Sequence, residues 1–217
     1  MESIFLDRED AGRQLAEELT AYANRQDVIV VALPRGGVPV AYPVAMALNA
    51  PLDIFLVRKL GVPGQEELAM GAIASGDIII LNERLVQELQ IDQAEIDEVI
   101  TREKQIIEIR EKTYIGDRKP ADMKNKIVLL IDDGIATGAT ILAAIAAIKK
   151  RGCAKIIIAV PVAPPDTVEM LRREVDDIVC LYTPVFFSAI GYFYMDFEQT
   201  TDQEVITLLN QASKHQV

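Results

Sequence analysis

Short, mostly apolar runs recur along the chain and alternate with longer polar segments. An apolar run of this length is typical of a strand that is covered on both faces of a parallel sheet. The predicted strands are residues 28–33, 52–57, 78–81, 127–131, 155–160 and 177–181. The first of them leads into Pro34-Arg35-Gly36-Gly37, whose proline and glycines indicate a tight turn.

The segments between these runs carry apolar residues at helical spacing. In the first segment, Ala11, Leu15 and Leu19 recur on one face behind Asp7, a typical helix-capping residue. Pro43 restricts the second helix to a start near that residue, because proline cannot donate within a helix. The predicted helices are 8–22, 38–48 with this restriction, 92–112, 138–150, 167–173 and 202–212.

Glycine and proline content marks the remaining segments as irregular. We expect a glycine-containing loop at 61–76, a connector at 116–125, a proline-rich turn at 161–165 and an aromatic tail at 184–197. No internal repeat or low-complexity tract is visible in the sequence.

Strands that alternate with helices predict an α/β fold, with a doubly wound, mainly parallel sheet flanked by helices. In such sheets ligands bind at the carboxyl ends of the strands. We interpret residues 1–217 as a single domain that carries a helical insert at about 92–116 and a small C-terminal hood at about 184–217.

Composition narrows the classes of ligand. Half of the 217 residues are hydrophobic and a quarter are charged, so the chain can bury a full core. The formal net charge of -11 argues against nucleic acid and anionic membrane surfaces as partners, since both require clustered Lys and Arg. A small phosphorylated ligand stays possible, because backbone N–H groups and a few basic side chains can hold phosphate inside an acidic protein.

The remaining composition excludes several kinds of site. Cys153 and Cys180 are the only cysteines and lack metal-ligand spacing, and the only histidine is His215, near the end of the chain. A histidine triad and a zinc site are therefore not expected. No basic leader with a long apolar run and no membrane span is visible, so we expect a cytoplasmic protein.

The segment 128–140 combines a strand, two acids and a helix start. Asp132 and Asp133 follow the apolar run, and a loop with Thr137, Gly138 and Thr140 opens the next helix. Unpaired N–H groups at a helix start and threonine hydroxyls suit a phosphate monoester. Adjacent carboxylates can accept hydrogen bonds from a vicinal diol or position hydrated Mg²⁺. A sugar phosphate fits both the acid pair and the loop at the helix start. The structural alternative is an N-capped helix that follows a buried strand with two solvent-facing acids.

This segment resembles the binding motif for phosphoribosyl pyrophosphate (PRPP) in type I phosphoribosyltransferases. The resemblance implies that Asp132 and Asp133 hold the ribose hydroxyls and Mg²⁺. It also implies that the following loop cradles the 5′-phosphate, with Gly134, Ala136, Thr137, Gly138, Ala139 and Thr140 as binding residues. A Walker A loop is excluded by the lack of Gly-Lys-Ser/Thr, and Gly134 excludes the Asp-x-Asp motif of haloacid dehalogenase-like proteins.

Two further segments resemble pyrophosphate-binding parts of the same family. Arg35, Gly36 and Gly37 follow the first strand, where glycine amides and an arginine can hold an anion. Taken alone, the tetrapeptide is better explained as a plain tight turn, and its place ahead of the PRPP motif reverses that preference. Arg58 and Lys59 precede Gly61-Val62-Pro63-Gly64-Gln65-Glu66-Glu67, which the resemblance makes a mobile lid over pyrophosphate. Surface charges on an ordinary loop are the alternative.

The insert and the tail resemble those of a little-characterised bacterial subgroup of the family. The tail is similar to the region where purine-salvage members stack a base and place an acid near Mg²⁺, so Phe187, Tyr192, Tyr194 and Asp196 are base-pocket candidates. Aromatic residues that close a core are the alternative. Hypoxanthine-guanine enzymes of the family usually carry an acid at the position of Ala136, and that acid interacts with the purine ring. Because alanine cannot make this interaction, the sequence does not support hypoxanthine or guanine as the acceptor.

The sequence therefore predicts an enzyme that binds Mg²⁺ and PRPP and transfers the phosphoribosyl group to a nucleobase-like acceptor, with release of pyrophosphate. Arg35, Arg58, Lys59, Asp132 and Asp133 are the predicted catalytic residues. A PRPP-binding regulatory protein without turnover is the alternative, while a PRPP synthetase would need two tandem domains. The resemblance makes a homodimer possible. The acceptor is not encoded in any motif.

Overall fold

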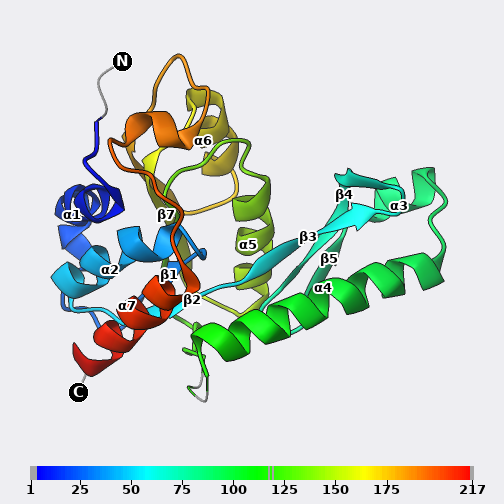
Figure 1. The fold of residues 1–217 in the computed structure, drawn as a ribbon, viewed down its shortest axis with the longest axis horizontal. Coiled ribbons are helices and arrows are strands. Elements are labelled where there is room, and N and C mark those ends of the chain that lie inside the picture. Colours follow the sequence, from blue (N-terminus) through cyan, green and yellow to red (C-terminus); the bar gives the residue numbers. More distant parts are fainter. Residues whose placement is uncertain (1–3, 117, 119, 216–217) are drawn as a thin grey trace.

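The computed structural model describes residues 4–116, 118 and 120–215. Its central sheet has five parallel strands in the order β2-β1-β6-β7-β8, which confirms the predicted doubly wound architecture (Figure 1). The strands are β1 (Val28–Ala32), β2 (Leu52–Ile54), β6 (Ile127–Ile131), β7 (Lys155–Val162) and β8 (Asp177–Tyr182). The strand order reverses between β1 and β6, and ligands of such sheets bind beyond the carboxyl ends of the strands at this reversal.

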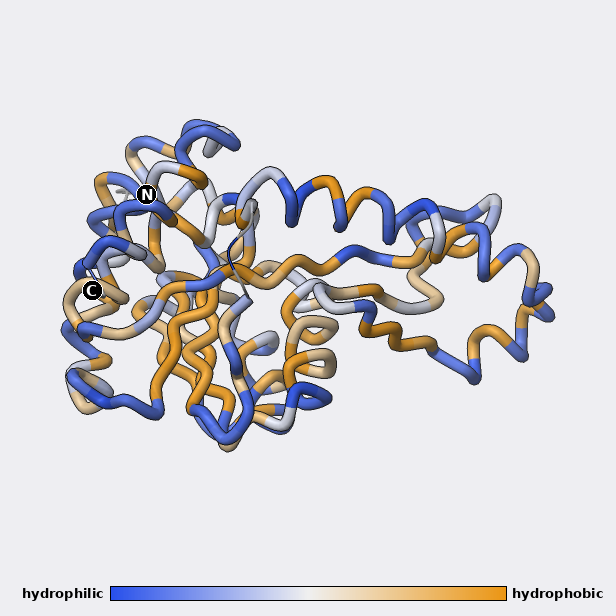
Figure 2. The backbone as a smooth tube through the Cα atoms, turned by 90° about the horizontal axis from the view of Figure 1, so that it is seen from below, coloured by the Kyte–Doolittle hydropathy of each residue, from blue (hydrophilic) through white to orange (hydrophobic). Residues whose placement is uncertain are grey.

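Helices cover both faces of the sheet, because each strand alternates its apolar side chains between them (Figure 1). One face packs against α1 (Arg8–Glu18), α2 (Gly37–Leu48) and α7 (Asp202–His215). The other packs against α5 (Ala139–Lys150) and α6 (Pro165–Arg172). The apolar strands form the continuous hydrophobic centre of Figure 2. Asp7 caps α1 as predicted, since its side chain accepts from the Asp10 N–H.

The predicted start of the second helix near Pro43 is wrong. Helix α2 begins at Gly37 and contains Pro43 in its interior. Helix α1 packs so closely here that a Cβ on Gly12 would overlap the Val40 carbonyl and lie 2.5 Å from Pro43 Cγ. Packing of this helix pair therefore outweighs the local cost of proline.

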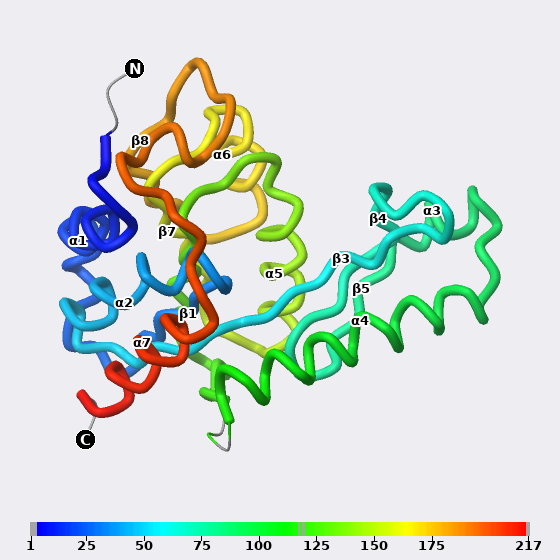
Figure 3. Tube along the Cα trace, in the orientation of Figure 1, coloured from blue at the N-terminus to red at the C-terminus, as the bar shows by residue number. Residues whose placement is uncertain are grey.

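An arm projects from the body and consists of β3 (Val57–Val62), β4 (Gln65–Ala74), β5 (Ile78–Leu81), α3 (Glu83–Glu88) and α4 (Gln93–Tyr114) (Figures 1 and 3). Its strands form a separate antiparallel sheet. The predicted loop at 61–76 is therefore wrong, because most of it is a β-hairpin. The strand predicted at 52–57 is divided between the two sheets, and the one at 78–81 belongs to the arm.

Helix α4 confirms the long amphipathic helix predicted for the insert. It starts with a capping box in which Asp92 and Glu95 satisfy each other's backbone N–H groups. Its buried residues follow a single stripe, which consists of Ile96, Val99, Glu103, Ile107 and Tyr114. The apolar members of this stripe join the same core cluster as β1, α2 and α7. The arm and the body thus share one core.

The tail closes the molecule beside the N-terminal segment. A short 3-10 helix at Ile190–Phe193 interrupts the otherwise irregular tail at 184–197, and Phe5, Phe193 and Tyr194 form a small core with Val162. The predicted helix at 202–212 is confirmed and extends to His215. The predicted connector at 116–125 and the predicted terminal segments include residues 1–3, 117, 119, 216 and 217, which lie outside the described part of the chain. None of the described helices has both the length and the apolar character needed to cross a membrane.

Candidate active site

The loops that follow β1 and β6 meet at the point where the strand order reverses. A Cβ on Gly36 would overlap the Asp133 carboxylate, and one on Gly37 would lie 2.8 Å from the Ile131 carbonyl oxygen. The two segments predicted to bind pyrophosphate and ribose therefore touch, and glycine is required at the contact. The peptide bond between Pro34 and Arg35 is cis.

Asp132 and Asp133 lie at the end of β6 with partly buried side chains. Asp132 Oδ1 accepts from the Asp133 backbone N–H at 2.9 Å. Burial raises the pKa of Asp132 well above its usual value, and the neighbouring Asp133 charge raises it further. Burial also raises the pKa of Asp133, although Arg8 opposes that rise. Asp132 and Asp133 thus form a partly buried pair of carboxyl groups that can bind hydrogen-bond donors or cations.

Arg8 of helix α1 is a part of this site that sequence reasoning missed. Its Nε lies 2.8 Å from Asp133 Oδ2, and both side chains are largely buried. Its Nη1 donates to the Glu198 carbonyl at 2.7 Å, and its guanidinium carbon lies 3.8 Å from the centre of the Phe197 ring. Arg8 therefore ties the N-terminal helix and the tail to the acid pair. No local motif marks it, because its partner lies 125 residues away.

The loop between Asp133 and α5 surrounds a cavity of about 210 Å³ lined by residues 132–141 and by Ile190 of the hood. Gly138 has a φ of 82°, which favours glycine, and helix α5 begins at the next residue. Thr167 of α6 donates its hydroxyl to the Ala136 carbonyl at 2.9 Å and steadies the loop. Helix α5 begins directly after this loop, and the N–H groups of a first helical turn have no partners within the helix.

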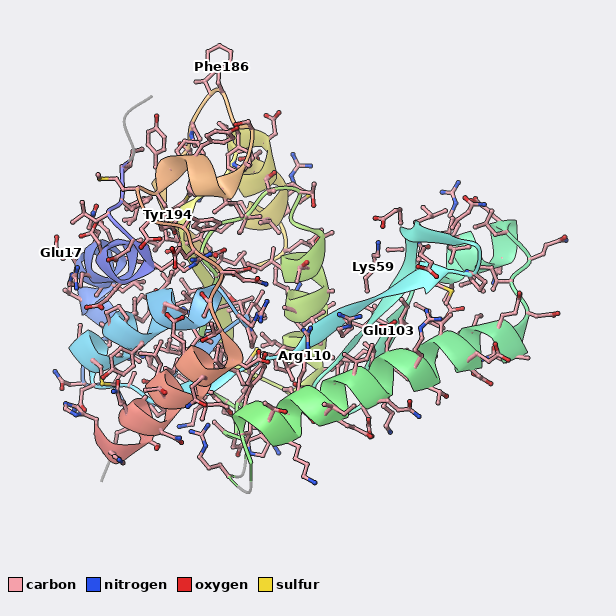
Figure 4. All side chains as sticks on the ribbon, in the orientation of Figure 1. Glu17, Lys59, Glu103, Arg110, Phe186 and Tyr194 are labelled. Carbon is pink, nitrogen blue, oxygen red and sulfur yellow. The ribbon has the colours of Figure 1, made fainter. Side chains whose placement is uncertain are left out.

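The three predicted pyrophosphate cations all have acidic partners. Arg35 Nη1 lies 3.5 Å from Asp202 Oδ1, and Lys59 Nζ lies 3.3 Å from Glu67 Oε2. Arg58 donates from Nε and Nη2 to Glu103 Oε2 of α4, at 2.8 and 2.7 Å. Figure 4 shows Lys59 on the arm sheet and Glu103 on the side of α4 that faces it.

Arg58 and Lys59 line a cavity of about 380 Å³ that also includes Arg102, Glu103 and Thr140. The cations of the arm therefore border the phosphate loop, although they come from a different sheet. The sequence predicts Arg58 and Lys59 at the end of a strand of the central sheet, whereas the structure places both residues in β3 of the arm.

Comparison with known proteins identifies the family. A family model described as "phosphoribosyl transferase domain" matches residues 3–196. The chain belongs to this family. Two Mycobacterium tuberculosis proteins, provisionally named phosphoribosyl transferases, are each 44% identical over 213 residues, which covers 97% of this chain and 47% of theirs. The chain thus spans about half the length of these curated relatives. A crystal structure of the protein TT1426 from Thermus thermophilus superimposes with a TM-score of 0.85 at 38% identity, covering 95% of this chain and 98% of that one.

The hood of this phosphoribosyl transferase domain places its four predicted base-pocket residues differently. Tyr192 is 66% exposed and Asp196 is exposed, whereas Phe187 is half-buried against Phe193. Tyr194 is buried under the acid pair, and its hydroxyl donates to the Asp133 carbonyl at 2.6 Å (Figure 4). Burial raises the pKa of Tyr194, so its hydroxyl stays protonated and can serve as this donor.

Ile190 is the hood residue that lines the phosphate-loop cavity. A Cβ on Gly134 would lie 2.7 Å from Ile190 Cγ2, so the hood packs directly on the PRPP motif. The sequence prediction favoured aromatic residues and did not include this aliphatic one, because only the fold brings residue 190 over the loop.

Proposed function

We propose that this phosphoribosyl transferase domain transfers the 5-phosphoribosyl group of PRPP to a nitrogen of a base, with a nucleobase as the preferred acceptor, and releases pyrophosphate. The contact between Gly36 and Asp133 carries this proposal. It unites a glycine loop, an acid pair and a helix start at one edge of the sheet, and PRPP requires all three kinds of group at once. The resemblance of the same segments to PRPP-binding motifs supports this function.

Each part of the donor matches a part of the site. The first turn of α5 and the hydroxyls of Thr137 and Thr140 suit the 5′-phosphate. Asp132 and Asp133 suit the ribose hydroxyls, since ionised carboxylates accept hydrogen bonds from a vicinal diol. The amides of loop 34–37 suit the pyrophosphate, with charge from Arg35, Arg58 and Lys59. Their acidic partners would have to share these cations with the substrate.

Mg²⁺ fits this arrangement as a companion of the substrate. The described residues contain no group of three or more potential metal-binding side chains, and Arg8 already occupies one oxygen of Asp133. Asp132 and Asp133 would therefore supply at most part of an octahedral oxygen shell, with phosphate and water oxygens for the rest. Bound Mg²⁺ would neutralise charge on the pyrophosphate.

The proposed reaction breaks the bond between ribose C1 and the pyrophosphate oxygen, which keeps the electron pair. A nitrogen of the acceptor forms the new bond to C1 with its lone pair and loses its proton to water. The residues of this chain contribute by orientation and charge. Asp132 and Asp133 fix the ribose, and Arg35, Arg58 and Lys59 stabilise the charge that develops on pyrophosphate.

The acceptor would approach between the phosphate loop and the hood. Phe187, Tyr192 and Asp196 stay candidates for this pocket, and Ile190 joins them because it lines the same cavity as Gly134. Tyr194 is better placed to support Asp133 than to stack on a base, since its ring is buried. Ala136 carries no acid for a purine ring, so a base without that requirement is favoured.

The test is release of pyrophosphate from PRPP and Mg²⁺, screened against purine and pyrimidine bases. We expect one class of base to give turnover, and we expect Asp132→Asn together with Asp133→Asn to abolish PRPP binding in calorimetry. Retained affinity in that double variant would contradict the donor assignment.

A PRPP-binding regulatory protein is the second candidate. The pairing of Arg35, Arg58 and Lys59 with carboxylates favours it, because paired cations contribute less charge to a leaving group. PRPP binding without pyrophosphate release for any base would support this candidate against the enzyme.

A further inference from the structure

One charged side chain interrupts the buried stripe of helix α4. Glu103 is 7% exposed and lies between Val99 and Ile107 on the face that packs against the arm sheet and the body. A carboxylate in such a position is costly unless cations or donors satisfy it. A charge at this core position therefore requires a well-placed partner.

That partner is Arg58. Two of its nitrogens donate to Glu103 Oε2, while Arg102 Nε lies 3.2 Å from Glu103 Oε1. The Arg58 side chain is 32% exposed and that of Glu103 only 9%, so the carboxylate holds the guanidinium from the buried side. A planar guanidinium that is fixed along one edge keeps its other donors for a second ligand.

Arg58 lines a cavity that reaches the phosphate loop. Arg58, Lys59 and Arg102 line the same cavity as Thr140, the last residue of the phosphate loop. Glu66, Glu67 and Glu103 also line this cavity, so its three cations lie among three carboxylates beside a predicted 5′-phosphate position. Glu103 pairs with two of the cations, Arg58 and Arg102.

We propose that Glu103 is a positioning residue that orients Arg58 toward the pyrophosphate of bound PRPP, which makes the insert helix α4 part of the donor site. This assignment rests on the proposed function. It gives the insert a role beyond packing, and it adds Arg102 as a further phosphate-binding residue.

The other end of α4 reaches the second pyrophosphate loop. The Tyr114 hydroxyl donates to Asp202 Oδ1 at 2.6 Å, and the same oxygen lies 3.5 Å from Arg35 Nη1. One helix therefore contacts, directly or through a single carboxylate, both of the arginines predicted to bind pyrophosphate. A helix that served only to cover the arm sheet would not need these polar links.

Charge and position make opposite demands at Glu103. Its negative charge alone would weaken binding of an anion, so its removal would tighten pyrophosphate binding if orientation were unimportant. Glu103→Asp separates the two effects, because it keeps the charge and withdraws the carboxylate by one methylene. Glu103→Gln keeps the length and removes the charge.

The experiment measures binding of pyrophosphate, PRPP and ribose 5-phosphate by calorimetry with Mg²⁺. In Glu103→Asp we expect pyrophosphate and PRPP to bind about ten-fold more weakly, since a misplaced charged donor loses its hydrogen bonds. Ribose 5-phosphate lacks the pyrophosphate and should bind unchanged, which also shows that the variant is folded. In an Arg58→Ala background, Glu103→Asp should have no further effect. Glu108→Asp is the matched control, because Glu108 is an exposed glutamate of the same helix.

Three results would overturn the assignment. If pyrophosphate binding is unchanged in Glu103→Asp and tighter in Glu103→Gln, Glu103 acts on the anion only through its negative charge and does not position Arg58. Equal losses for ribose 5-phosphate and pyrophosphate would make its effect purely structural. Absence of pyrophosphate and PRPP binding in the unmodified chain would overturn both this assignment and the proposed function.

Discussion

Arg8 and Asp133 join the N-terminal helix to the candidate active site through an ion pair that is mostly buried. The exposed fractions of the two side chains are 12% and 13%. Loss of one partner from a buried pair leaves the other charge without compensation. We expect Arg8→Gln to lower the free energy of unfolding by about 2–4 kcal/mol, as measured by urea denaturation.

Arg13 provides the control for this prediction on the same helix. Its side chain is 53% exposed and pairs with Glu9 one turn away. Arg13→Gln should change the free energy of unfolding by less than about 0.5 kcal/mol, because exposed pairs of this kind contribute little. Equal effects of the two substitutions would show that the Arg8 pair does not have its buried character in solution.

Gly36 allows the two substrate loops to touch. A Cβ at this position would overlap the Asp133 carboxylate, so Gly36→Ala must displace either loop 34–37 or the acid. We expect PRPP affinity to fall by about ten-fold or more in calorimetry, because donors and acceptors in a site must keep their positions closely. Gly116→Ala is the control, because open space surrounds this glycine and its φ of 60° disfavours alanine, whereas the right-handed backbone of Gly36, with a φ of -59°, accepts a side chain. PRPP affinity that survives Gly36→Ala would argue against the contact.

At the residue scale, the sequence predicted those site residues that lie next to one another in a motif. Asp132, Asp133 and the loop to Thr140 are contiguous, and the structure brings Gly36 and Gly37 against them. Arg8 and Ile190 could not be found this way, because tertiary packing alone brings them to the loop. Glu103 did carry a signal. It occupies a position in the i, i+3, i+4 stripe of α4 where an apolar residue is expected.

At the level of elements, continuous apolar runs predicted every core strand, whereas the hairpin β3–β4 was misread as a loop. Its glycines permit close approach of backbones, because a Cβ on Gly61 would lie 2.6 Å from the Glu66 carbonyl oxygen. Residues 65–69 are exposed, so the start of β4 lacks the alternation that marks a half-buried strand. Glycines that serve sheet packing and glycines that form loops look alike in sequence.

The link between α4 and α7 predicts a pH dependence. The Tyr114 hydroxyl donates to Asp202, and burial together with this bond raises the pKa of Tyr114 from 10.0 to about 12. The unfolded chain loses the Tyr114 proton at a lower pH than the folded chain. The stabilisation that the protonated hydroxyl gives to the folded state is therefore complete below about pH 10 and disappears as the pH rises toward 12. Wild type should therefore be more stable than Tyr114→Phe at pH 8 in urea denaturation, and this difference should shrink through the alkaline range.

Tyr192→Phe is the control for this prediction, because Tyr192 is 66% exposed in the hood. Its stability should stay close to that of the wild type, as is usual for exposed positions. A stability difference between wild type and Tyr114→Phe that does not change with pH would mean that the hydroxyl does not bond to Asp202 in solution.

At the scale of the whole molecule, the arm extends from the body and yet shares its core. One hydrophobic cluster includes Ile96, Val99 and Ile107 of α4 together with residues of β1, α2 and α7. Secondary structure alone would allow the arm to be a separate folding unit, since its sheet is not hydrogen-bonded to the central one. The shared cluster favours a single domain, as the sequence predicted, and that interpretation can be tested.

We expect one cooperative thermal transition with equal calorimetric and van't Hoff enthalpies. Ile107 is 4% exposed, so Ile107→Ala should lower the stability of the entire chain by about 2–5 kcal/mol and its Tm by about 5–15 °C. Ile109→Ala is the matched control on the same helix, because Ile109 is 65% exposed and its truncation leaves the core intact. If Ile107→Ala instead split the transition and moved only its first part, the arm would be an independent unit. Arg58 could then leave the phosphate loop without unfolding of the body.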